Sequence, residues 1–296
     1  MQRYARRGDK IADVLIYGIT GLCALICLLP ILNTLAISFS SSTMAMAGKV
    51  TFWPLDFTLE AYKMVVSDKQ FFASFSNSAL RVLLGGILNF ILTVLAAFPL
   101  AHPSKSFRGR NVYMWVLVFC MLFSGGLIPM YIMVSSLGLL DSVWALVLPG
   151  AVPVWNCILL MNFFKGLPGE LEEAAIIDGA QPFQILWRIF LPVSLPALST
   201  VTLFSVVGHW NEFFSGMIYM NNTANYPLAT YISTMVDAAK DISTVTDPEE
   251  LERLMKTSNT TINSAKIFVS MVPVLLLYPF MQRYFVTGLV MGSVKE

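Results

Sequence analysis

Polar side chains gather within one turn near the end of a long apolar segment of the sequence. The run reads His209-Trp210-Asn211-Glu212-Phe213, and at about 1.5 Å per residue from Pro192 it lies in the distal half of the helix that the segment predicts. Hydrogen-bonding groups beside flat aromatic rings suit a ligand rich in hydroxyl groups. The same residues could instead join two helices, with the glutamate neutral or paired. Trp155 and Asn156 form a second, smaller pair of this kind.

Recognisable catalytic and metal-binding arrangements are missing from the sequence. The two histidines, His102 and His209, are far apart, and no Ser-His-Asp or His-Glu-x-x-His pattern occurs. All four cysteines fall inside apolar segments without disulfide or metal-ligand spacing. No Gly-x-x-x-x-Gly-Lys-Ser/Thr loop is available to hold the phosphates of ATP. We therefore expect a non-catalytic chain that carries no cofactor or metal of its own.

The composition excludes an ordinary water-soluble protein. Of the 296 residues, 56% are hydrophobic and only 12% are charged, and the mean hydropathy is +0.68. A soluble domain needs about a quarter of its residues charged to cover its surface. Much of this chain must therefore face lipid. The net charge of +1 gives no sign of nucleic-acid binding.

Six segments are long enough to cross a bilayer, which takes about 20 mostly apolar residues. They are residues 14–39, 79–101, 112–135, 143–164, 195–220 and 265–286. Backbone groups in hydrocarbon must be hydrogen-bonded within the chain, and a β-barrel would show alternating strands of about ten residues instead. The sequence thus predicts an all-α integral membrane protein, a six-helix domain over residues 14–290. Kinks are expected at the prolines inside the segments, namely Pro30, Pro129, Pro149, Pro153 and Pro273.

The positions of Lys and Arg predict the orientation in the membrane. The N-terminal arm, residues 1–13, and the loop after the second segment are basic, whereas residues 137–141 contain no Lys or Arg. Both termini are therefore expected in the cytoplasm. The loops are then assigned as follows: 40–78 and 221–264 outside, 165–192 and the tail 291–296 inside. Loop 221–264 is the most polar, as expected for a solvated cap or for a docking surface for an external protein.

The loop 165–192 has a pattern of its own. Residues 170–177 are helix formers with acids in the first turn, Asp178-Gly179 ends the helix, and Pro182 can open the next one. The prediction is a helix-turn-helix at the membrane face. Small residues that allow a close approach and apolar anchors both occur: Ala174, Ala175, Ala180, Leu171, Ile176, Phe183, Ile185, Leu186, Ile189 and Phe190. Such a loop indicates a protein partner, although an interfacial amphipathic segment without one is the alternative.

The same loop resembles the EAA motif of inner-membrane subunits of ABC importers. The resemblance lies in Glu173-Ala174-Ala175-Ile-Ile-Asp178-Gly179-Ala180, followed by Ile189-Phe-Leu191-Pro192. In that family the motif forms coupling helices that sit in a groove of the ATPase subunit. The residues that the resemblance assigns to ATPase coupling are Glu172, Glu173, Ala174, Ala175, Asp178, Gly179, Ala180, Leu191 and Pro192. Gly179 would be required for the turn, because a side chain would strain a positive φ there.

Shorter runs extend the resemblance over nearly the whole chain. They include Asn77-Ser78-Ala79-Leu80, the Trp144–Pro149 run and the C-terminal stretch 282–295. Their order and spacing are similar to the maltose-type carbohydrate uptake group, and most to subunits for complex or longer oligosaccharides. The resemblance implies a bacterial inner or plasma membrane and several partners. These are a second homologous permease subunit, a homodimeric ATPase that holds ATP and Mg²⁺, an extracytoplasmic sugar-binding protein and the oligosaccharide itself.

Within this family, the polar residues of the apolar segments become candidates for the substrate pathway. They are His209, Trp210, Asn211, Glu212, Phe213, Trp155 and Asn156. An ABC importer for another solute, such as a peptide or an amino acid, is the main alternative function. An ion-coupled secondary transporter would need acidic residues in the middle of the membrane, and the coupling motif would have no role in it. A membrane enzyme is disfavoured by the missing catalytic patterns.

Overall fold

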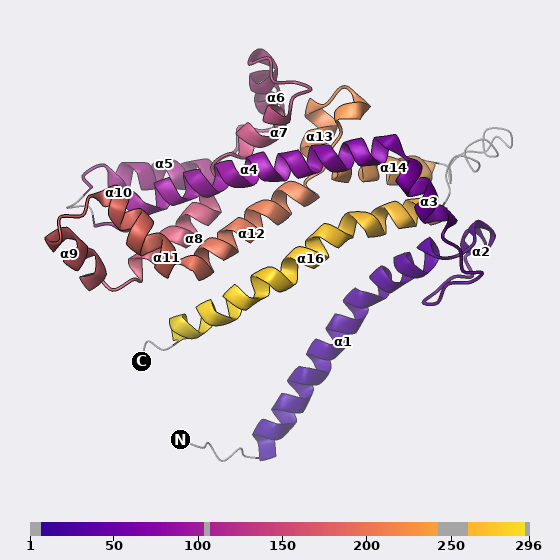
Figure 1. Cartoon of the computed structure of the whole chain (residues 1–296), viewed down its shortest axis with the longest axis horizontal. Coiled ribbons are helices and arrows are strands. Elements are labelled where there is room, and N and C mark those ends of the chain that lie inside the picture. Colours follow the sequence, from indigo (N-terminus) through magenta and orange to yellow (C-terminus); the bar gives the residue numbers. More distant parts are fainter. Residues whose placement is uncertain (1–6, 104–106, 242–259, 294–296) are drawn as a thin grey trace. The chain divides into compact units, whose positions relative to one another are not determined.

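A computed structural model describes residues 7–103, 107–241 and 260–293 of the chain (Figure 1). Within these ranges the protein is helical and contains no β-strand, so the all-α prediction is confirmed there. Parts of the predicted N-terminal arm, of the outer loop 221–264 and of the C-terminal tail lie outside the described residues. Lys105, one of the basic residues used to predict orientation, also lies outside them.

The chain divides into two compact units. The first comprises Met1–Lys69 and Thr234–Met271, and the second comprises Gln70–Ser233 and Val272–Glu296. The first unit holds α1 (Arg7–Ser38), α2 (Ser42–Met46) and α3 (Glu60–Ser67). Two helices, α14 (Leu228–Asp241) and α16 (Thr260–Ser293), are divided between the units, and α4 (Lys69–Ala101) has only its first residue in the first unit.

In the first unit, polar bonds fold the segment after α1 back onto the end of that helix. Asn33 on α1 donates to the Thr51 carbonyl at 2.7 Å, and the Ser38 and Tyr62 hydroxyls are 2.8 Å apart. Lys266 on α16 pairs with Asp68, directly after α3, with 2.6 Å between Nζ and Oδ2. These bonds join α1, α3 and α16. The part of α1 that is long and apolar enough to cross a membrane, Ala12–Ser38, has no buried residues in its most apolar 18-residue stretch. It therefore makes few contacts with the rest of the described chain.

The second unit contains the remaining helices. In chain order they are α4 (Lys69–Ala101), α5 (Arg110–Leu122), α6 (Leu127–Ser136), α7 (Val143–Val147), the 3₁₀ turn η1 (Leu148–Gly150), α8 (Val154–Lys165), α9 (Glu170–Ile177), α10 (Pro182–Ile185), the π-helical turn η2 (Leu186–Phe190), α11 (Leu191–Val193), α12 (Leu195–Asn211), α13 (Phe214–Tyr219) and the 3₁₀ turn η3 (Thr223–Asn225). The coupling region, α9 and α10, lies beyond the C-terminal end of α4 (Figure 1).

The long helices match the predicted spans, and the count of six depends on bent pairs. Three helices of the described chain are long and apolar enough to cross a membrane: Ala12–Ser38, Lys69–Ala101 and Thr260–Pro279. Three bent helix pairs pass the same test together, which gives up to six spans by length and composition. The kink expected near Pro149 and Pro153 is present, since the helices on either side of this region meet at 46°.

Besides the kinked span 143–164, two further predicted spans are not continuous helices, and the expectation of one helix in each was wrong. Within 112–135 the chain bends by 111° between α5 and α6, because Gly125 and Gly126 disfavour helix and Gly126 takes a φ of 87°. Within 195–220, α12 ends at Asn211 and α13 begins at Phe214. Glu212 between them has an extended backbone, with ψ at 117°. The polar run therefore lies at a helix break instead of inside a helix.

One face of α4 carries residues that are small or polar, and this face is buried. Its members recur every three or four residues: Ser74, Ser78, Arg81, Gly85, Asn89 and Thr93. The large apolar side chains of the same helix are exposed: Leu80, Leu83, Ile87, Ile91 and Leu95. Small and polar residues let helices in lipid approach closely and bond to one another, while the apolar face suits hydrocarbon. α4 thus directs its hydrogen-bonding groups toward the interior of the second unit.

The coupling region packs against this unit through a single apolar core. Phe190 of η2 lies edge-on to Phe98 of α4 and Phe164 of α8, with ring centroids 5.1 and 5.4 Å apart. Residues from α9, α10, α11 and α12 complete the core, including Ala175 and Leu191. The region is therefore a packed part of the second unit and not a free loop.

Candidate functional site

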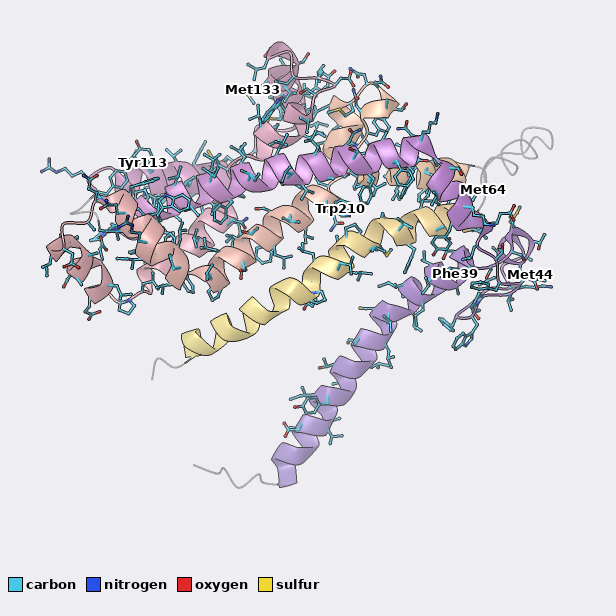
Figure 2. The ribbon with its side chains drawn as sticks, in the orientation of Figure 1. Phe39, Met44, Met64, Tyr113, Met133 and Trp210 are labelled. Atoms are coloured by element: carbon cyan, nitrogen blue, oxygen red, sulfur yellow. The ribbon has the colours of Figure 1, made fainter. Side chains whose placement is uncertain are left out.

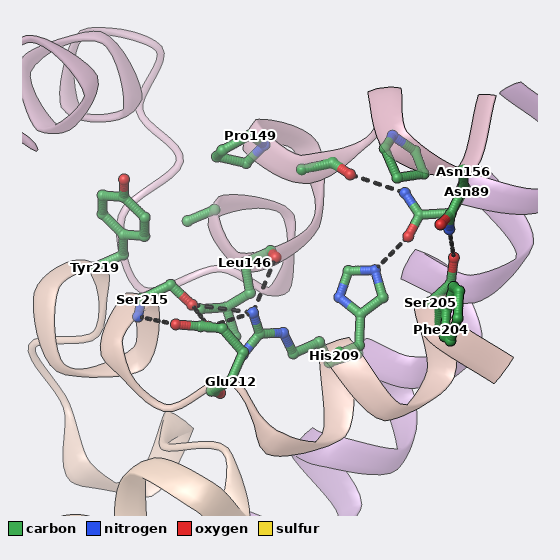
Figure 3. A pocket seen from close by; sticks show the side chains of 15 residues that line it. Asn89, Leu146, Pro149, Asn156, Phe204, Ser205, His209, Glu212, Ser215 and Tyr219 are labelled. Carbon is green, nitrogen blue, oxygen red and sulfur yellow. Dashed lines mark hydrogen bonds and ion pairs between the residues drawn. The ribbon is translucent and has the colours of Figure 1, made fainter. Parts of the chain in front are cut away.

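A cavity of about 530 Å³ opens between the middle helices of the second unit (Figure 3). Five elements contribute to its wall: α4, the α7–η1 segment, α8, α12 and α13. The polar residues that line it are Arg81, Asn89, Asn156, Ser205, His209, Glu212 and Ser215, and the apolar ones include Leu146, Pro149, Pro153, Phe204 and Tyr219. The volume falls within the range of about 300–1,000 Å³ that is typical of small-molecule sites.

One end of the cavity is organised by an ion pair at the break between α12 and α13. Arg81, only 3% exposed, places Nη2 2.5 Å from the Glu212 carboxylate. Its guanidinium also donates to the Glu212 carbonyl at 2.9 Å and to the Leu146 carbonyl at 3.4 Å. Glu212 accepts the backbone N–H of Ser215 at 2.8 Å, and its second oxygen bonds the Ser215 hydroxyl. The pair therefore supplies partners for backbone groups that the broken helices leave open.

A second set of bonds holds His209 at the other side of the cavity, where Figure 3 shows its ring directed at Asn89. The Asn89 amide nitrogen donates to the Gly150 and Ala151 carbonyls at 2.8 and 2.9 Å, so its oxygen is left to accept from His209 Nε2 at 2.8 Å. Gly85 makes room for the ring, because a Cβ at this position would collide with the imidazole of His209. Nδ1 is then the ring atom that a neutral His209 can offer as an acceptor.

The predicted pathway residues divide into two groups. His209, Glu212 and Asn156 line the cavity, and Asn156 donates to the Ser205 hydroxyl at 3.1 Å. The other four do not line it. Trp210 lies edge-on to Phe75, with ring centroids 5.4 Å apart. The remaining three residues are exposed: Asn211, Phe213 and Trp155. An α-helix turns by about 100° per residue, so neighbours in the run 209–213 cannot all face the same side.

The coupling helix presents a mixed apolar and acidic surface. Glu173, Ala174, Asp178 and Gly179 are exposed, beside Ile177 at 85% exposure. Two other predicted coupling residues, Ala175 and Leu191, are buried in the chain's own core. Pro192 is exposed and Ala180 is half-buried. Glu172 is half-buried as well, and its carboxylate lies 2.8 Å from His102 Nε2.

The turn after the coupling helix has the geometry that the sequence predicts. Gly179 takes a φ of 77°, its N–H bonds the Ile176 carbonyl at 3.0 Å, and the Ala180 N–H bonds the Ala175 carbonyl at 2.9 Å. These two bonds form a Schellman motif, which uses a left-handed residue after the helix end. Glycine reaches this φ without strain. Pro182 then opens α10 at its first turn, as expected.

The sequence profile of binding-protein-dependent transport system inner membrane components matches residues 71–291. This match spans most of the chain and includes both the cavity and the coupling region. The chain belongs to this family. It is thus an inner-membrane component of a transport system, and the resemblance seen in its coupling motif is confirmed at the level of the family.

Individual relatives of this membrane component are similar over their whole length. The polygalacturonan/rhamnogalacturonan transport system permease protein YtcP of Bacillus subtilis is 38% identical over 97% of this chain and 99% of its own. Protein LplC of the same organism is 38% identical over 98% of this chain and 96% of its own. The crystal structure of a bacterial ABC transporter involved in the import of the acidic polysaccharide alginate contains a chain with 32% identity. It aligns with a TM-score of 0.82 over 96% of this chain and 100% of that one.

Sequence reasoning missed Arg81, Asn89 as a cavity residue, and Ser215. The most accessible signal was Arg81 itself. It is a cation near the start of the predicted span 79–101, and Glu212 is the only acidic residue within the six predicted spans. Charges within lipid-embedded segments usually pair with one another, so the two could have been matched. Asn89 and Ser215 gave no comparable signal, because their roles depend on which helix ends lie opposite them.

The Arg81–Glu212 pair should show strong energetic coupling. In a cycle of Arg81→Met, Glu212→Gln and the double variant, we expect Arg81→Met alone to cost on the order of 2 kcal/mol, because it leaves a half-buried carboxylate and two carbonyls without their donor. The double variant should cost less than the sum of the two single changes. Thermal unfolding of the purified assembly in detergent measures these differences. Asn211→Ala, at the exposed neighbouring position, is the control, and additive costs in the cycle would contradict the assignment.

Proposed function

We propose that this chain is the permease subunit of an ATP-driven importer for oligosaccharides derived from polysaccharides. Full-length similarity to a polygalacturonan/rhamnogalacturonan permease, at 38% identity, carries the proposal. The likeness to a chain of an alginate importer, with a TM-score of 0.82, supports the same substrate class. ATP would be hydrolysed on separate subunits, because the sequence has no phosphate-binding loop.

The partners follow from the exposed surfaces and from the family. We propose that α9 and the Gly179 turn dock on a homodimeric ATPase that holds ATP and Mg²⁺ in the cytoplasm, where both termini would also lie. The surface of α9 offers small residues for close approach and Ile177 as an apolar anchor. A second, homologous permease subunit would complete the pathway, and an extracytoplasmic binding protein would deliver the saccharide from the other side. Both permease subunits would alternate between inward-facing and outward-facing states.

The cavity is the proposed place of passage for the sugar in this subunit. His209 and Asn156 offer hydrogen-bonding groups for hydroxyls, and Phe204 offers an aromatic face. Arg81 Nε is buried and has no acceptor within the described chain, which favours a hydroxyl or water as its partner. Glu212 would act mainly by pairing with Arg81 and by accepting the Ser215 N–H at the start of α13. Trp210, Asn211, Phe213 and Trp155 would contribute only if the sister subunit or lipid meets them, since none of them lines the cavity.

Substrate-dependent ATP hydrolysis tests the proposed function. The complete complex in proteoliposomes should hydrolyse ATP faster when its binding protein is loaded with oligogalacturonides than when it is offered malto-oligosaccharides or a tripeptide. A preference for oligosaccharides over peptides supports the saccharide assignment. Stimulation by the peptide alone would contradict it and would favour the alternative importer class.

Two adjacent glycines separate the role of the His209 pocket from the packing of α4. Gly85→Ala should displace the imidazole from Asn89 and reduce saccharide uptake several-fold, because its new methyl group collides with the ring. Gly86→Ala is the matched control, since the nearest atom to its Cβ, on Val206, is 3.8 Å away. Uptake of labelled oligosaccharide at several concentrations measures the effect. Equal uptake by the two variants would remove His209 from the pathway.

A second glycine pair tests the coupling turn. Gly179→Ala forces a side chain into a φ of 77° and costs about 1 kcal/mol locally, so saccharide-stimulated ATP hydrolysis should fall while insertion into the membrane is preserved. Gly169→Ala, at the other end of α9, has a φ of −63° and open space around its Cβ, and it should behave as the unchanged protein. Identical ATPase rates for both variants would show that the turn does not transmit the signal.

A further inference from the structure

His102 follows directly after α4 and connects that helix to the coupling helix. Its Nδ1 lies 2.8 Å from the Phe98 carbonyl, and its Nε2 lies 2.8 Å from Glu172 Oε1 on α9. The ring lies nearly parallel to Phe190 of η2 and edge-on to Phe98. Both partners of the ion pair are shielded, with side-chain exposures of 16% for the histidine and 28% for the glutamate. The contact thus joins three elements in a mostly water-excluded place.

These two contacts divide the ring nitrogens between two elements. The Phe98 carbonyl can only accept, so Nδ1 donates to it, and Nε2 is left to share a proton with the Glu172 carboxyl. Glu172 lies in the first turn of α9, where the helix dipole favours an acidic side chain. The link to α9 therefore needs a hydrogen-bonding group both at position 102 and at position 172.

The helix α4, which ends just before His102, also carries Arg81 of the cavity. Residues 81 and 102 are 21 positions apart (102 minus 81), which corresponds to about 30 Å of helix. At one end, His102 bonds α9; toward the other, Arg81 bonds the α12–α13 break and the Leu146 carbonyl. A displacement of α9 can therefore reach the cavity through one rigid element with polar attachments at both points.

We infer that His102 is a positioning residue that fastens the coupling helix α9 to α4 through its bond to Glu172, so that transmission from the ATPase to the cavity depends on this link. The inference rests on the proposed function for its consequence in transport. The fastening itself does not depend on the substrate.

The decisive comparison is between Glu172→Gln and Glu172→Ala. A glutamine amide can both donate and accept, so Glu172→Gln retains a bond to the ring, whereas Glu172→Ala removes it. In the complete complex, saccharide-stimulated ATP hydrolysis should stay near the rate of the unchanged protein in Glu172→Gln and fall about tenfold in Glu172→Ala. His102→Phe keeps the ring stack but has no N–H, and it should be as low as Glu172→Ala. Glu170→Gln, the same exchange at an exposed position of α9, should follow the unchanged protein.

Hydrogen–deuterium exchange separates the fastening from transport. With the assembled complexes at one pH, the amides of α9 should exchange faster in Glu172→Ala than in Glu172→Gln, because only the alanine variant loses the bond to His102. Equal exchange together with equal hydrolysis in these two variants would overturn the inference. If exchange differs as expected but no saccharide stimulates hydrolysis, the fastening is supported and the proposed function fails.

Discussion

Broken helices impose the constraint on which the second unit depends. Where a helix stops, its last carbonyls and first N–H groups lose their partners, and hydrocarbon could supply none. Arg81 and Asn89, both on α4, donate to carbonyls at two such breaks, and Glu212 accepts the N–H of Ser215 at the start of α13. One unbroken helix therefore supports its interrupted neighbours, and the cavity lies where the interruptions are.

The polar side chains of the cavity are bonded before any ligand arrives. Figure 2 shows Trp210 on α12, the helix that also carries His209. Each polar side chain that lines the cavity already makes at least one bond to another side chain or to the backbone, so a saccharide would meet a preformed surface rather than isolated charges. Preorganised polar groups cost less to desolvate on binding than mobile ones do.

Features encoded locally were predictable from the sequence, and features encoded by distant pairs were not. The coupling helix has the bounds that its acids and its Asp178-Gly179 stop indicated, because capping and glycine conformation act within a few residues. The helical class followed from composition in the same way. By contrast, the break at Glu212 depends on Arg81, which is 131 residues away in the sequence. Nor could spacing alone show that Trp210 packs on Phe75 while His209 faces the cavity.

The buried face of α4 is small or polar and its exposed face is apolar, which is the reverse of a water-soluble helix. This reversal affects which positions of the helix can vary during evolution. In a water-soluble helix the buried apolar positions are the constrained ones and the polar positions vary. Here the large aliphatic residues are exposed and suit hydrocarbon, so they can be exchanged for one another, whereas Ser78, Gly85 and Asn89 each occupy a place that admits few substitutes. Substitution rates along this helix should therefore rise and fall with the helical period, and the least variable positions should be the smallest and most polar.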